Sequence, residues 1–235
     1  MSYYINLSIL SNIHNNLNRI ERQKGLSAEA RRILSLCEGR PITDDNIARE
    51  ASGRPFFPGS DTDFNISHSG SLTAVSLVRG KNLRTGCDVE LVRPRARAKE
   101  IAEKFFSAQE KEYIGSGEHF DETRFYQIWT LKECYLKLRG LSVFDIPGTP
   151  SFVSGLEAAA HGSFEFSGAV SSPLSFSLYE LTGGAGERYT LASVIEGTVE
   201  CQPEIRWCSQ DFLDCKSIAK IKAAPSPAET VSPKI

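Results

Sequence analysis

Hydrophobic residues recur at helical spacing from Phe125 to Arg139, in the middle of the chain. At about 100° per residue, the apolar residues of this stretch fall on one broad arc of a helix. That arc is formed by Phe125, Ile128, Leu131, Tyr135, Leu136 and Leu138. Trp129, Glu133 and Lys137 follow one line along its border. The pattern predicts a core helix whose carboxylate and ammonium are either a surface ion pair or ligands directed into a cleft.

The rest of the chain alternates between strand-like and helical patterns. Strands are expected over residues 3–10, 64–67, 72–78, 83–91, 164–170, 174–180 and 188–196, and 204–207 is a candidate for one more. Helices are expected over residues 15–24, 27–37, 101–106, 107–114 and 121–139, with Ser27 and Ser107 as N-caps. The strands after residue 160 are expected to pair antiparallel. This order of elements predicts an α+β protein.

Two comparable α+β halves, divided near residue 97, are the expected domain organisation. The first half spans residues 1–97 and the second spans 98–222, and the Pro/Ser-rich tail, 223–235, is expected to be disordered. The chain has 235 residues, of which 40% are hydrophobic and 24% are charged, enough to bury one large core or two small ones.

The charge balance and hydropathy exclude several classes of partner. A formal net charge of −2 gives no overall basic field for nucleic acid. No apolar run approaches the roughly 18–20 residues needed to cross a bilayer, and the N-terminus lacks the features of a signal peptide. We therefore expect a cytosolic protein. The strongest basic patch, which is either a surface for an acidic partner or a solvated linker, consists of Arg93, Arg95, Arg97 and Lys99.

The chain has six cysteines, none of which forms a C-x-x-C pair. Cys201, Cys208 and Cys215 recur at intervals of seven, but no histidine lies near them in the sequence. Without such a ligand or a secretion signal, a zinc site and a disulfide framework are both weakly supported. We expect reduced thiols that are mostly buried.

Two acids and a histidine are the first candidates for chemistry. Asp88 and Glu90 are two residues apart in an expected strand, so both side chains project from one face. Their repulsion must be offset by arginines, by water or by a divalent cation, and paired carboxylates suit Mg²⁺. His68 lies in a predicted corner between Ser67 and Ser69. That setting suits a phosphate oxygen, and it suits equally a turn histidine bonded to its own backbone.

Arg54 is a further candidate for a phosphate contact. It lies in a Gly53-Arg54-Pro55 turn, where the proline fixes the backbone and the guanidinium is expected to be exposed.

Each of these features is weak alone. Together, the segments FNISHS (64–69), GCDVE (86–90) and WTLKECYLK (129–137) resemble the three signatures of the 4′-phosphopantetheinyl transferase superfamily. They occur in the family's order and at its spacings, with the usual FFS…E element (105–110) before the third.

The resemblance is specific over residues 51–140, and the chain length fits the larger, surfactin-synthetase-activating type. It implies two similar α+β halves, each with a small antiparallel sheet packed against helices. These halves form a pseudodimer within one monomeric chain, with the active site at their junction. The implied reaction transfers 4′-phosphopantetheine from coenzyme A to a serine of an apo acyl or peptidyl carrier protein. It releases adenosine 3′,5′-bisphosphate.

The resemblance also implies roles for individual residues. The ligands that hold Mg²⁺ against the diphosphate of coenzyme A would be Asp88, Glu90 and Glu133. The residues that contact coenzyme A itself would be Arg54, Ser67, His68 and Lys137. Glu133, or a water molecule that it orients, would take the serine proton. The catalytic group would thus consist of Asp88, Glu133 and Lys137.

Some positions depart from the family pattern. Cys87 and Cys134 stand where a small or aliphatic residue is usual, and Arg54 replaces the more usual lysine. The first forty residues match poorly, so the basic contacts to the 3′-phosphate have only candidates: Arg19, Arg22, Lys24, Arg31 and Arg32.

Two other functions remain open. One is a non-catalytic module that binds coenzyme A or a carrier protein. The other is a different metal-dependent phosphoryl enzyme, such as a diphosphatase. The sequence does not identify the pathway of the carrier.

Overall fold

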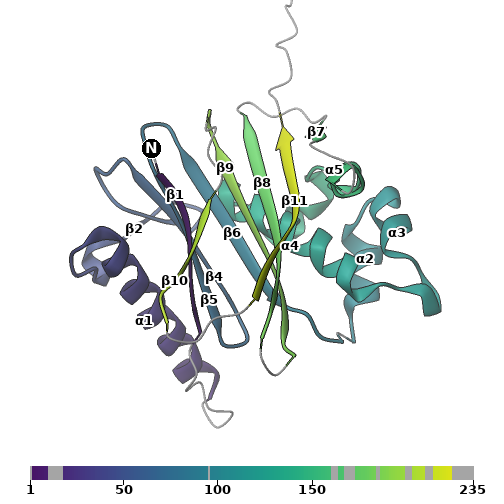
Figure 1. Ribbon diagram of the computed structural model, residues 1–235, viewed down its shortest axis with the longest axis horizontal. Helices are drawn as coiled ribbons and strands as arrows, with labels where there is room; N and C mark the ends of the chain where they lie inside the picture. The colour runs from purple at the N-terminus through teal and green to yellow at the C-terminus, as the bar shows by residue number, and fades with distance from the viewer. Residues whose placement is uncertain are drawn as a thin grey trace, which may run out of the picture.

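The computed structural model describes residues 2–9, 18–94, 96–159, 164–166, 173–183, 186–198, 203–209 and 214–223. Their strands form two main sheets that lie side by side, with α1 beside one sheet and the other α-helices beside the second (Figure 1). This confirms a mixed α+β architecture with small, mainly antiparallel sheets. No helix in the described part of the chain is long and apolar enough to cross a membrane. The predicted tail lies outside the described residues, apart from Ala223.

The first sheet has the strand order β10-β1-β5-β4. Its strands are β1 (Ser2–Ile9), β4 (Thr62–Ser69), β5 (Leu72–Arg79) and β10 (Glu204–Trp207). Helix α1 (Arg19–Glu38) covers one face of this sheet, where Ile33 and Leu34 pack against Phe64, Val75 and Leu77. The opposite face is turned toward the second sheet.

The second sheet has the strand order β6-β9-β8-β11-β7. Its strands are β6 (Arg84–Leu91), β7 (Phe164–Phe166), β8 (Leu174–Thr182), β9 (Arg188–Glu196) and β11 (Asp214–Ala223). The helices beside it are α2 (Ala98–Phe105), α3 (Ala108–Ile114), α4 (Glu122–Arg139) and α5 (Val153–Ala159). The short elements of the chain are η1 (Asp44–Asn46), β2 (Ala48–Arg49), β3 (Pro55–Phe56), η2 (Gly117–His119) and η3 (Val143–Gly148).

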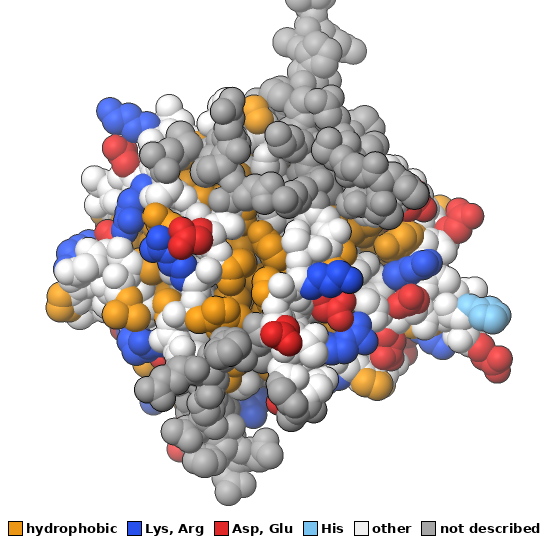
Figure 2. Space-filling model, viewed as in Figure 1, with side chains coloured by type: hydrophobic (Ala, Val, Ile, Leu, Met, Phe, Trp, Pro, Cys, Tyr) orange, Lys and Arg blue, Asp and Glu red, His pale blue; other side chains and the backbone are white. Residues whose placement is uncertain are grey.

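A hydrophobic cluster joins the two sheets. Ile5 and Leu72 of the first sheet belong to the same cluster as Val89, Leu181 and Leu191 of the second. In the space-filling view, hydrophobic side chains gather near the middle of the face, while most charged side chains lie toward its two sides (Figure 2). The two sheets are therefore held together by a shared core.

Helix α1 is a single helix where the sequence predicted two. Its N-cap is Asn18, whose side chain accepts hydrogen bonds from the N–H groups of Ile20 and Glu21. Ser27, the predicted N-cap, lies inside the helix, so that prediction is wrong. Leu26 and Ala30 are both buried, which carries the apolar face across the predicted break.

Among the strands near the C-terminus, β8 and β9 pair antiparallel as predicted, but two others pair differently. β10 runs parallel to β1 in the first sheet, and β7 runs parallel to β11 in the second. Both were expected in an antiparallel arrangement. β11 was not predicted, and residues 167–170 of the predicted strand lie outside the described residues. Alternation within a short strand indicates which side chains are buried, but it does not identify the neighbouring strand.

The helix predicted over residues 121–139 is confirmed as α4. The Asp121 side chain caps its first turn by accepting a hydrogen bond from the Arg124 N–H, and Gly140 ends the helix in the left-handed conformation, with φ 66°. The N-cap predicted at Ser107 is also confirmed, because its Oγ accepts a hydrogen bond from the Glu110 N–H.

A buried ion pair connects α3 to α4. Lys132 Nζ lies 2.9 Å from Glu110 Oε1, and these side chains are 2% and 0% exposed. Lys132 Nζ also donates to Thr149 Oγ1 at 2.8 Å. Burial lowers the pKa of Lys132, and the Glu110 charge only partly offsets this effect. Lys132 thus faces away from solvent, although it directly precedes Glu133.

Candidate active site

Strand β6 and helix α4 bring together the two acidic motifs found in the sequence. Lys137 Nζ of α4 lies 2.7 Å from Asp88 Oδ1, and Trp129 Nε1 donates to Glu90 Oε1 at 3.2 Å. Asp88 is 4% exposed, while Glu90 is half-buried. The side of α4 that carries Trp129 and Lys137 therefore contacts the face of β6 that carries Asp88 and Glu90.

The close approach of β6 to α4 depends on Gly86. A Cβ atom at this position would lie 2.5 Å from the Cys134 carbonyl oxygen and 3.1 Å from Leu138 Cβ. Backbone atoms of α4 thus occupy the space that a side chain would need. The glycine of the GCDVE segment lets the helix lie directly on the strand.

Gly86→Ala is expected to destabilise the protein by about 1–3 kcal/mol, because the added methyl group must push α4 away from β6. Urea denaturation measures the change in the free energy of unfolding. Gly25→Ala is the matched control, since a Cβ at Gly25 meets nothing within 4 Å and alanine favours the helix interior. Equal stability of Gly86→Ala and wild type would contradict the proposed contact.

Ser67 is the centre of a small network at Asp88. Its Oγ donates to Asp88 Oδ1 at 2.8 Å and accepts hydrogen bonds from Lys137 Nζ at 2.8 Å and the Val89 N–H at 3.2 Å. Burial lowers the pKa of Lys137, but the charges of Asp88 and nearby groups outweigh it, so the pKa lies above its usual range. Lys137 is therefore a cation, held against Asp88.

Glu90 and Glu133 complete the acidic side of the site. Ser69 Oγ donates to Glu90 Oε2 at 3.0 Å, opposite the bond from Trp129. Glu133 is half-buried on α4, one turn from Trp129 and one from Lys137, and its charge helps to raise the pKa of Lys137. The hydrogen bonds from Ser69 and Trp129 to Glu90 were not predicted, although both residues belong to the recognised motifs.

His68 lies on β4 between the two serines and is exposed. Partial removal from water lowers the pKa of its imidazole, and the positive charge of Lys137 lowers it further. A neutral imidazole near a lysine is suited to receive a proton when an anion binds. The turn of the β4–β5 hairpin is at Gly70 and Ser71 rather than at His68, which still pairs with Thr73.

Arg54 does not lie where the sequence predicted. It was expected to be exposed, yet it is only 4% exposed. Its guanidinium forms a two-pronged ion pair with Asp63 of β4, with one N–O distance of 2.9 Å, and donates to the Thr85 carbonyl at 2.8 Å. The half-buried carboxylate of Asp63 draws the arginine inward, so Arg54 connects β4 to β6.

Two of the N-terminal basic residues already have acidic partners. Arg31 Nη1 lies 2.9 Å from Asp44 Oδ1, and Arg32 Nη2 lies 2.6 Å from Glu29 Oε1. Arg22 and Lys24 are exposed, and the side chain of Arg19 lies outside the described residues.

The cysteines divide into three groups. Cys87 and Cys134 are fully buried between β6 and α4, and burial raises the pKa of both thiols. Cys37 and Cys208 are half-buried, and burial raises the pKa of Cys37 to about 11. Cys215 is exposed, and Cys201 lies outside the described residues. The prediction of mostly buried thiols therefore holds for the first pair only.

No group of three His, Cys, Asp or Glu side chains in the described ranges is gathered as a metal site. Asp88 Oδ2 is nevertheless buried, and none of the described residues offers it a hydrogen bond.

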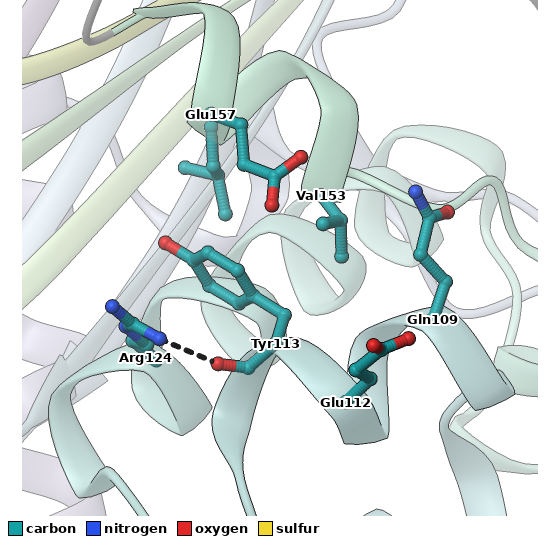
Figure 3. Close-up of a pocket in the computed structure, with 7 residues that line it drawn as sticks. Gln109, Glu112, Tyr113, Arg124, Val153 and Glu157 are labelled. Carbon is teal, nitrogen blue, oxygen red and sulfur yellow. Dashed lines mark hydrogen bonds between the residues drawn. The ribbon is translucent and has the colours of Figure 1, made fainter.

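A pocket of about 610 Å³ lies elsewhere, and Figure 3 shows Arg124 donating to the Tyr113 carbonyl at its edge. It is lined by Gln109, Glu112, Tyr113, Arg124, Val153, Leu156 and Glu157. The site acids are therefore separate from this pocket.

Comparison with known proteins shows a family to which this part of the chain is similar. The family model of the 4′-phosphopantetheinyl transferase superfamily matches residues 84–191, which begin at β6 and include all of α4. The 4′-phosphopantetheinyl transferase AcpT of Escherichia coli K12 is 34% identical over 130 residues, which are 54% of this chain and 65% of AcpT. HetI of Nostoc is 33% identical over 129 residues, 52% of this chain and 48% of HetI. The protein psf-1 of Bacillus pumilus is 29% identical over 115 residues, 48% of this chain and 47% of psf-1.

The matched part of the chain thus spans just under two thirds of AcpT and about half of the other two. The sequence motifs, the site on β6 and α4, and these relatives agree. Over residues 84–191 this chain is similar to the 4′-phosphopantetheinyl transferase superfamily.

Proposed function

We propose that this protein transfers the 4′-phosphopantetheine moiety of coenzyme A to a serine of an apo acyl or peptidyl carrier protein. The observation that carries the proposal is the contact between β6 and α4, where Asp88 and Glu133 lie near the ammonium of Lys137 and Glu90 accepts a hydrogen bond from Trp129. Phosphoryl transfer needs chiefly positioning and neutralised charge, and this group of side chains can supply both.

The proposed metal ligands are Asp88, Glu90 and Glu133. Carboxylate oxygens are the donors that Mg²⁺ prefers, and the buried Oδ2 of Asp88, with no hydrogen bond from the described residues, is an oxygen suited to a cation. A bound Mg²⁺ would neutralise the diphosphate of coenzyme A and the charge that develops on it. The residues present therefore fit the proposed ion.

The protein's own groups have separate proposed tasks. Lys137, a cation under the influence of Asp88, would bind the bridging phosphate. Glu133 would accept the proton of the carrier serine, either directly or through a water molecule, as the serine oxygen bonds to phosphorus. The bond from that phosphorus to the remaining phosphate breaks, and adenosine 3′,5′-bisphosphate leaves. His68 would contact a phosphate of coenzyme A.

We also propose that the two halves of the chain, 1–97 and 98–222, act as a pseudodimer with the site at their junction. Ser67 and Ser69 come from the first sheet, whereas Glu133 and Lys137 come from a helix beside the second. β6 precedes residue 97 but pairs with β9, which lies after it. A monomer with both halves in one chain would therefore contain the whole site.

The carrier's docking surface has one candidate in the sequence. Arg93, Arg97 and Lys99 are exposed, and Arg95 lies outside the described residues. Lys99 Nζ donates to the Gly117 carbonyl at 2.7 Å, so Arg93 and Arg97 are the described side chains of the patch proposed for an acidic partner. We propose that the protein acts in the cytoplasm, where coenzyme A is available.

The proposed function is tested by incubating the protein with coenzyme A, Mg²⁺ and a panel of apo carrier proteins, followed by mass spectrometry of each carrier. A gain of one phosphopantetheine group is expected on at least one carrier. Binding of coenzyme A without any mass gain would favour a binding module. Hydrolysis of coenzyme A in the absence of a carrier would favour a diphosphatase.

Binding of coenzyme A is expected to tighten as the pH falls from about 8 to 6. Burial and Lys137 hold the pKa of His68 below its usual range, and an anionic phosphate beside the imidazole would raise it. Binding would then be coupled to the uptake of a proton by His68. As the pH falls, the affinity for coenzyme A rises from the His68 pKa in the complex downward and becomes constant below the His68 pKa of the free protein. Calorimetry in buffers of different ionisation enthalpy measures this uptake.

His68→Gln is the control for that measurement, because glutamine keeps a polar side chain that cannot titrate. The variant should bind coenzyme A with a smaller pH dependence. The same proton uptake in His68→Gln and wild type would assign the titration to another group.

A further inference from the structure

A row of polar side chains on β4 faces the backbone of β6. Asp63, Asn65, Ser67 and Ser69 alternate along β4, and each accepts a hydrogen bond from a β6 N–H group that lies 22 residues later. The donors are Thr85 (2.8 Å to Asp63 Oδ2), Cys87 (3.1 Å to Asn65 Oδ1), Val89 (3.2 Å to Ser67 Oγ) and Leu91 (3.0 Å to Ser69 Oγ). These four hydrogen bonds are called the β4–β6 row below.

The β4–β6 row supplies hydrogen-bond acceptors to the edge of the second sheet that has no neighbouring strand among the described residues. Among the described strands, β6 pairs only with β9 and β4 only with β5, so no backbone pairing joins β4 to β6. Every second N–H group of β6 points away from β9, and Thr85, Cys87 and Val89 are buried. A buried N–H group without an acceptor is costly, and the side chains of β4 supply the acceptors.

The two serines of the row perform a second task. Ser67 Oγ donates to Asp88 Oδ1 at 2.8 Å, and Ser69 Oγ donates to Glu90 Oε2 at 3.0 Å. In both cases the carboxylate belongs to the residue directly before the N–H donor. A hydroxyl can accept one bond and donate another at once, whereas an aspartate can only accept. The hydroxyls therefore occur where a β6 carboxylate has to be held.

We infer that Ser67 and Ser69 are positioning residues, which fix the direction of Asp88 and Glu90 through hydroxyl hydrogen bonds and hold β6 in register with β4. This inference rests on the proposed function, in which both carboxylates bind a divalent cation. The resemblance implied that Ser67 contacts coenzyme A, whereas this inference assigns it the task of orienting Asp88. Its Oγ already donates to Asp88 and accepts from Val89 and Lys137, which uses its full hydrogen-bonding capacity.

The test compares Ser69→Ala with Ser69→Thr in the full chain, because threonine restores the hydroxyl. Mn²⁺ affinity is measured by electron paramagnetic resonance, and exchange of the Leu91 amide is measured by NMR. Ser69→Ala should weaken Mn²⁺ binding by about 10- to 100-fold, as is typical when a partner of a metal ligand is lost, and should speed exchange at Leu91. Ser69→Thr should restore both values to within about threefold of wild type.

Asn65→Ala is the matched variant from the same row, because Asn65 bonds to a backbone N–H and to no β6 carboxylate in the described contacts. It should speed exchange at Cys87 with little change in Mn²⁺ affinity. Unchanged Mn²⁺ affinity and Leu91 exchange in Ser69→Ala would overturn the inference. Failure of wild type to bind Mn²⁺ or to modify any carrier would instead overturn the proposed function, and amide exchange would still decide whether the row exists.

Discussion

Replacing Asp88 with asparagine is expected to reduce phosphopantetheine transfer by at least about a thousandfold while the protein stays folded. Asparagine has the same size, and its oxygen can accept the hydrogen bonds that Ser67 and Lys137 donate at 2.8 and 2.7 Å. The substitution removes the charge proposed to hold Mg²⁺. It also removes the main charge that raises the pKa of Lys137 against the effect of burial.

Single-turnover transfer to a carrier protein measures the loss, and circular dichroism checks the fold. Glu112→Gln is the matched control, because it neutralises an exposed carboxylate that lines the separate pocket in Figure 3. Glu112→Gln should transfer at the wild-type rate. A wild-type rate in Asp88→Asn would remove Asp88 from the catalytic group and with it the metal assignment.

The part of the site on α4 and β6 could be predicted because both motifs lie in long, regular patterns. The line of Trp129, Glu133 and Lys137 follows from helical spacing, and the shared face of Asp88 and Glu90 follows from alternation in a strand. Gly86 stands in the second motif, but its purpose depends on the backbone of α4, more than forty residues later. The sequence therefore predicts which faces carry acids, but not how closely they approach.

The contributions of β4 could not be predicted in the same way. Asp63, Asn65, Ser67 and Ser69 alternate with Phe64, Ile66 and His68, and such a row of polar residues usually indicates a strand face that is open to water. Here the polar face is covered by β6, because β6 needs acceptors along its unpaired edge. The row of polar residues is visible in the sequence, but the strand that it contacts, β6, belongs to the other sheet.

The same long-range effect explains Arg54. A turn with a proline favours an exposed arginine locally, but the half-buried carboxylate of Asp63 lies within reach once β4 is in place. The local sequence predicted the conformation of the backbone turn, but the ion pair with Asp63 determines where the Arg54 side chain lies. Arg54 therefore supports the first member of the β4–β6 row.

Lys132→Met is expected to lower the free energy of unfolding by about 3–5 kcal/mol, because it leaves the carboxylate of Glu110 buried without its cation. For a chain of this size, that loss corresponds to a fall in Tm of roughly 6–20 °C. Urea denaturation followed by tryptophan fluorescence measures it. The expected defect is in stability, since Lys132 faces α3 rather than Asp88.

The double variant Glu110→Gln/Lys132→Met separates the buried charge from lost packing. Glutamine can still accept the hydrogen bond that the Ser107 N–H donates to Glu110 Oε2 at 3.0 Å, so the cap of α3 remains. Without a carboxylate there is no uncompensated charge, and most of the lost stability should return. If the double variant were as unstable as Lys132→Met, the loss would come from the packing of the lysine chain, and the ion pair would contribute little to the attachment of α3 to α4.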